Sequence, residues 1–112
     1  MAWNYLIEKG YKLLEKNYSC RLGEIDVVAK KEGRYRFVEI KTRAQKRFGM
    51  PEESVHHVKQ KRLVRLALWY LKEKKLGEPP VSFDVLSVYY DGEDEPGIRL
   101  IENAFSVDNE IG

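Results

Sequence analysis

Two short segments that alternate apolar and polar residues, separated by a polar stretch with a single glycine, constrain this fold more than any other feature. The segments are 23–28 and 37–41, and their period of two is that of a β-strand. If Glu32 and Gly33 form a two-residue turn between them, the numbers of paired residues sum to 65. The sequence therefore predicts an antiparallel hairpin with a defined register.

This register predicts an unusual group of charges on one face of the hairpin. Asp26 would lie opposite Glu39, and Glu24 opposite Lys41, with all four side chains on the same side. Two like charges directly opposite one another destabilise a sheet by roughly a few tenths of a kcal/mol or more. A hard cation such as Mg²⁺ would offset this repulsion, because it binds one or two carboxylates and completes its shell with water and phosphate oxygens.

A solvated strand face is the alternative interpretation, because exposed strands often carry Glu and Lys. That alternative predicts a face that is polar throughout. Here the same face continues with Val28 opposite Phe37, so part of it is covered and the carboxylates would stand at the edge of the cover. Clefts form at such edges, but the short pattern alone leaves both interpretations open.

Length and composition bound the class of protein. The 112 residues are expected to form one domain, 1–112, with a core that needs neither disulfides nor a structural metal. Cys20 is the only cysteine, which favours a reducing, cytoplasmic location. The first residues are too polar for a signal peptide, and no apolar run is long enough for a membrane span. The net charge of +2 does not by itself require a nucleic-acid partner.

Periodicity and turn residues place the remaining elements. The expected elements are a helix over 2–16, strands over 18–21, 24–30 and 34–42, a helix over 51–75, and strands over 82–90 and 98–105. The order α-β-β-β-α-β-β predicts an α+β or α/β domain with helices flanking a mixed sheet. Trp3 and Trp69 are predicted to be core aromatics.

Basic residues gather in the second predicted helix and in the loop before it. A solvated helix face is the common outcome of such a run, and phosphate binding is the alternative. The neighbouring His56 and His57 point in different directions on a helix, so they are not predicted to form a metal pair. The expected nucleic-acid-binding residues are Thr42, Arg43, Lys46, Arg47, Lys59 and Arg62.

Six blocks of sequence carry a family resemblance that spans nearly the whole chain. They are 23–26, 38–43, 48–53, 59–63, 83–85 and 102–105. Asp26 followed by Glu39-Ile40-Lys41 on a hairpin resembles the core of the PD-(D/E)XK nucleases. The six blocks together resemble more closely the YraN-like family of uncharacterised bacterial proteins, which is related to archaeal Holliday-junction resolvases.

The resemblance implies a restriction-endonuclease-like core and hydrolysis of phosphodiester bonds, in DNA that is structured or branched. Asp26, Glu39 and the Ile40 carbonyl would bind Mg²⁺ or Mn²⁺. Lys41 would act at the scissile phosphate, with Glu24 orienting it, although a simple Glu24–Lys41 salt bridge is the alternative. Junction resolvases that resemble this chain act as dimers, so a homodimer is expected as well.

One departure from the family pattern bears on catalysis. The first helix of the family usually opens with Gly-Glu three residues before the alanine that matches Ala2, and the present sequence starts after that position. This leaves a reduced site or a natural start further upstream. Two further hypotheses therefore stand beside the nuclease: a non-catalytic nucleic-acid-binding module with the same fold, and a scaffold in which the acid pair is a structural relic.

Overall fold

The computed structural model describes residues 2–43, 57–90 and 96–105 of the 112-residue chain. Its elements are α1 (Ala2–Glu8), β1 (Lys12–Cys20), β2 (Gly23–Lys31), β3 (Arg34–Arg43), α2 (His57–Glu73), β4 (Val81–Tyr89) and β5 (Gly97–Phe105). This order and the mixed sheet confirm the predicted fold class.

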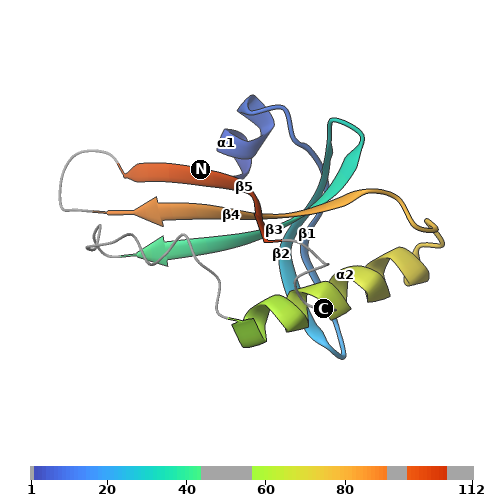
Figure 1. The fold of residues 1–112 in the computed structure, drawn as a ribbon. Helices are drawn as coiled ribbons and strands as arrows, with labels where there is room; N and C mark the ends of the chain where they lie inside the picture. Colours follow the sequence, from blue (N-terminus) through green and yellow to red (C-terminus); the bar gives the residue numbers. More distant parts are fainter. Residues whose placement is uncertain (1, 44–56, 91–95, 106–112) are drawn as a thin grey trace.

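The five strands form one sheet in the order β1-β2-β3-β4-β5. Strands β3 and β4 are parallel, and every other neighbouring pair is antiparallel. The parallel pair needs a crossover connection, and α2 lies within it. Figure 1 shows α1 on one side of the sheet and α2 on the other, so the domain has three layers.

The predicted helix over 2–16 is wrong beyond its first two turns. Gly10 has a φ of 95°, a left-handed conformation that glycine adopts without strain. The amide of Tyr11 donates to the carbonyl of Leu6 at 3.0 Å, and the amide of Gly10 to that of Ile7 at 3.0 Å. This is the Schellman pattern that ends a helix, and it lets the chain turn directly into β1.

The predicted hairpin is confirmed in its turn and in its register. Glu32 and Gly33 have φ angles of 53° and 76°, and positive φ at both central residues defines a type I′ turn. Pairing runs from Lys31 with Arg34 to Val27 with Val38, so each pair sums to the predicted value.

Two apolar clusters fill the spaces between the layers. The cluster under α2 includes Ile25, Val28 and Phe37, while the cluster on the α1 side includes Leu6 and Val27. Burial of both faces explains why β4 is buried along nearly its whole length.

Parts of the prediction fall outside the described residues. They are the start of the second helix over 51–56 and the basic loop before it over 44–50. In the part of the chain that is described, no helix is both long and apolar enough to cross a membrane.

Candidate functional site

The candidate site lies where β2 and β3 separate. Their ladder ends at Val27 and Val38, one step before Asp26 and Glu39. Beyond this point β2 remains paired with β1, and β3 remains paired with β4 through Arg43. A gap therefore opens between two strands that are each still held on their other edge.

The side chain of Asp26 bridges the two strands where this gap begins. Its Oδ2 accepts a hydrogen bond from the backbone amide of Ile40 at 2.7 Å. The carboxylate is partly buried, and it shares a hollow with residues of α1, β1 and β3. The lining residues are Ala2, Trp3, Asn17, Asp26 and Ile40.

Glu39 points to the other side of the sheet. Its carboxylate is bonded to the Nζ of Lys59, which reaches down from α2. Glu39 is only 9% exposed, so this charge is largely removed from water and is neutralised by one lysine.

The prediction that Asp26 and Glu39 share one face is therefore wrong. Ile25 and Val28 both pack under α2, although strict alternation would place residues three apart on opposite faces. The alternation skips one step at Asp26, and this turns the carboxylate toward the α1 side. Both acids still converge on one segment, since one bonds the Ile40 amide and the other is the residue before it.

Glu24 and Lys41 do not form the predicted pair. Glu24 is exposed, lies opposite Ser19 in the β1–β2 ladder, and makes no ion pair with any described residue. Lys41 is half-buried and lies beside Ser87 in the parallel ladder. Alternation from Phe37 places Lys41 on the same side as Glu39, as predicted.

The expected nucleic-acid-binding residues divide into three groups. Lys59 is held at Glu39, and Arg62 is exposed one turn further along α2. Thr42 is exposed near the end of β3, and Arg43 is the last residue of that strand. Lys46 and Arg47 lie outside the described residues.

The donor set fits a hard cation in part. The amide and carbonyl of a strand residue point to the same edge, so the Ile40 carbonyl faces the gap that holds Asp26. Carboxylate and carbonyl oxygens are the ligands that Mg²⁺ and Mn²⁺ prefer. Glu39 is held by Lys59 on the α2 side and does not present its oxygens to this edge in the structure. Within the described ranges, no group of three or more His, Cys, Asp or Glu side chains could hold a metal.

Sequence reasoning missed a second polar cluster, buried on the α1 side around Asp84. This side chain is 1% exposed and accepts hydrogen bonds from four groups. The donors are the Tyr11 hydroxyl at 2.5 Å, the Ser82 hydroxyl at 2.6 Å, the Asn103 amide at 2.9 Å and Arg36 Nη1 at 3.4 Å. Burial, reinforced by the bond to Asp84, raises the pKa of Tyr11 far above its ordinary value. The signal was present, since Arg36 and Asp84 interrupt two apolar strands.

Comparison with known proteins identifies relatives along most of the chain. The model of the uncharacterised protein family UPF0102 matches residues 1–88. A UPF0102 protein of Clostridioides difficile is 45% identical over 105 residues, covering 94% of this chain and 90% of the relative. A UPF0102 protein of Lachnoclostridium phytofermentans is 46% identical over 105 residues, covering 93% and 85%. The family resemblance found in the sequence is confirmed, and the family brings no described activity with it.

Proposed function

We propose that this chain, which belongs to the uncharacterised protein family UPF0102, is a metal-dependent nuclease that hydrolyses phosphodiester bonds in structured or branched DNA. One observation carries the proposal. Where β2 and β3 part, the Asp26 carboxylate bonds the Ile40 amide, and Ile40 is flanked on β3 by Glu39 and Lys41. Two acids, a carbonyl and a lysine thus meet at one short segment at the edge of a gap.

Each residue at this segment has a distinct role in the proposed reaction. Asp26 and the Ile40 carbonyl present oxygens to one edge, and Glu39 would add a third only if its carboxylate left Lys59 and turned from the α2 side toward that edge. A bound Mg²⁺ or Mn²⁺ would supply a Lewis acid that polarises the phosphate. Lys41 would stabilise the charge that develops on the phosphate oxygens or orient the attacking water.

Lys59 is a competitor for the cation in this proposal. Its ammonium already neutralises Glu39, so Glu39 could hold a cation only after Lys59 has moved away. A released Lys59 would be available to contact a substrate phosphate. This exchange would couple metal binding to nucleic-acid binding. The cation would take Glu39 from the Lys59–Glu39 pair, and the phosphate would take Lys59.

The alternative is a nucleic-acid-binding module without turnover. One observation favours it: both carboxylates already have a partner inside the protein. The partner of Asp26 is the backbone amide of Ile40, and the partner of Glu39 is the ammonium of Lys59. An acid pair that is satisfied in this way can persist without a metal.

A cleavage panel separates the two. The full chain is incubated with Mg²⁺ or Mn²⁺ and with a four-way DNA junction, a flap, single-stranded DNA and RNA. The nuclease proposal expects cleavage of at least one substrate, and expects Asp26→Asn to remove it. Binding without cleavage of any substrate would leave the non-catalytic module, and equal cleavage by Asp26→Asn would place the active site elsewhere.

A further inference from the structure

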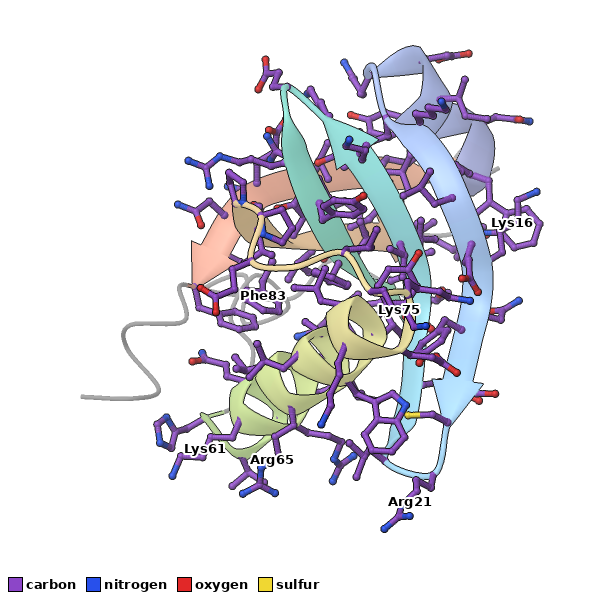
Figure 2. The ribbon with its side chains drawn as sticks, turned by 90° about the vertical axis from the view of Figure 1, so that its right-hand side faces the viewer. Lys16, Arg21, Lys61, Arg65, Lys75 and Phe83 are labelled. Carbon is purple, nitrogen blue, oxygen red and sulfur yellow. The ribbon has the colours of Figure 1, made fainter. Side chains whose placement is uncertain are left out.

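A cationic surface extends outward from the candidate site along α2. Its members are defined here as the cationic track: Arg21, Lys61, Arg62 and Arg65. The last three line one hollow together with Leu22 and Val58. Figure 2 shows Lys61 and Arg65 extending away from the sheet on α2, with Arg21 at the nearby turn between β1 and β2.

The charges of the track are not neutralised from within the described parts of the protein. All four side chains are exposed, and none forms an ion pair with a described acid. Along α2 the only acid is Glu73, near the far end of the helix, where it accepts a hydrogen bond from Tyr18. Among the described residues the track is thus a positively charged surface, and such a surface suits an anionic partner.

Arg21 is held in place by an aromatic ring. Its guanidinium lies 5.7 Å from the centre of the Trp69 ring. Trp69 was predicted to be a core residue, but it is 36% exposed. A cation–π contact of this kind favours the guanidinium near the ring and leaves its N–H groups available to a phosphate.

The track is continuous with the carboxylate pair. Lys59 bonds Glu39, and Arg62 follows on the next turn of the helix. Arg62 and Leu66 lie against Gly23, where a Cβ would come within 3.8 Å and 3.6 Å of them. Gly23 opens β2 and lies three residues before Asp26. From Lys59 to Arg65 the helix rises by about 9 Å, so one nucleic-acid strand could reach both ends.

We infer that the cationic track binds the phosphate backbone of the nucleic-acid strand that leads to the Asp26–Glu39 segment. This inference rests on the proposed function and extends it to a defined contact surface. Arginine guanidinium groups can bind phosphate oxygens bidentately, and the track lies beside the segment proposed to cleave a phosphodiester, which favours a phosphodiester chain as the partner. Each phosphate contact adds about 0.9 to the negative salt slope of binding to duplex DNA.

The test removes three positive charges from the cationic track and compares the effect with that of removing three positive charges elsewhere. The track variant is Arg21→Gln/Lys61→Gln/Arg65→Gln, and it retains Arg62 because that side chain packs on Gly23. The control is Lys12→Gln/Lys72→Gln/Lys75→Gln, which changes the net charge equally at exposed positions away from the track. Figure 2 shows Lys75 at the opposite end of α2 from Lys61 and Arg65.

Binding of each full-length protein to a fluorescein-labelled DNA duplex with a single-stranded arm is measured by anisotropy, in EDTA and across a range of salt concentrations. The track variant should lose about two to three units of salt slope, while the control should keep nearly the slope of the parent. A third variant, Arg21→Lys/Arg65→Lys, should also keep the slope because it retains the charges. Thermal melting by circular dichroism confirms that each variant is folded.

Two results would overturn the inference. One is an equal loss of slope in the track variant and the control, which would mean that only net charge matters. The other is equally tight binding of poly-glutamate by the parent, which would favour an acidic protein partner. Because these measurements need no cleavage, they are independent of the nuclease proposal: a slope change without any cleavage would support the track and refute the nuclease.

Discussion

The two groups of buried or partly buried carboxylates in this domain are satisfied to very different degrees. Asp84 accepts four hydrogen bonds, which is the number of lone-pair directions that a carboxylate offers. Asp26 and Glu39 each have one bonding partner among the described residues, the Ile40 amide and the Lys59 ammonium. The first group has no capacity left for a ligand, while in the second several oxygen lone pairs have no partner among the described residues.

This difference separates a structural role from a ligand-binding one. A saturated buried acid stabilises its surroundings because its removal would leave several donors without an acceptor. An acid with open lone pairs can in addition bind a cation or a water molecule. On this criterion Asp84 has a structural role on the α1 side, and the Asp26–Glu39 segment is the one that we propose for chemistry.

The largest effect is expected at the saturated acid. Asp84→Asn keeps the shape of the side chain but removes the charge that faces the buried Arg36, which is 4% exposed. Breaking a buried pair in this way costs about 3 to 5 kcal/mol, and should lower Tm by more than about 10 °C. Thermal unfolding followed by circular dichroism measures the change.

The same chemical change at Asp26 provides the matched control. Asp26→Asn removes the negative charge but keeps a side-chain oxygen that can accept the single hydrogen bond from the Ile40 amide, so a loss of about 1 kcal/mol or less is expected. If Asp26→Asn destabilises as much as Asp84→Asn, the distinction between saturated and open acids fails.

Metal binding should depend on the open acids. Mg²⁺ or Mn²⁺ at about 100 times its Kd would stabilise the folded parent by about 2.7 kcal/mol, because it binds the folded state alone. Asp26→Asn should abolish this shift. Glu24→Gln should preserve it, since Glu24 is exposed and has no ion pair among the described residues. An unchanged shift in Asp26→Asn would locate the cation elsewhere.

Lys41 distinguishes chemistry from binding at the same segment. Lys41→Met keeps most of the stem and removes the charge and donors, so metal-induced stabilisation should remain. Cleavage should fall by roughly 10² or more, the usual loss when one preorganised electrostatic partner is removed. Single-turnover cleavage is the readout, and an equal rate in Lys41→Met would remove Lys41 from the mechanism.

Local sequence determined the hairpin well, because its register follows from the turn. Positive φ at Glu32 and Gly33 forces a two-residue connection, and every pair up to Val27 with Val38 follows from it. The end of the first helix was harder to predict from the sequence. A periodic apolar pattern continues through Leu14, but the Schellman bonds at Gly10 end the helix and packing of the sheet then favours β1.

The residues proposed for the candidate site were named from the sequence, but their spatial arrangement was not predicted. The skipped alternation at Asp26 depends on how β2 packs between α1 and α2, which no local pattern encodes. The Lys59–Glu39 bond joins residues separated by 20 positions, and it exists because α2 crosses the end of β3. Sequence reasoning could name both residues, but it could not pair them before the crossover was known.

The smallest expected effect is at Glu102, an exposed residue at the edge of the polar cluster around Asp84. Lys31 Nζ lies 2.8 Å from one Glu102 oxygen, and Arg36 Nη1 lies 3.1 Å from the other. The hydrogen bond from Lys31, assisted by the charges of Lys31 and Arg36, holds the pKa of the Glu102 carboxyl below its ordinary value despite partial burial. The folded state therefore binds this proton less readily than the unfolded state.

The sign of the pH dependence follows from this depressed pKa. The stabilisation by Glu102 is present above its unfolded pKa, near 4.5, and is lost as pH falls through the lower folded pKa. Solvent screens this half-exposed pair, so Glu102→Gln should cost at most about 1 kcal/mol at neutral pH. The difference from the parent should vanish in acid, when Glu102 is protonated. Urea unfolding at several pH values tests this, with the exposed Glu78→Gln as control; a difference that persists in acid would show that Glu102 acts through packing instead of charge.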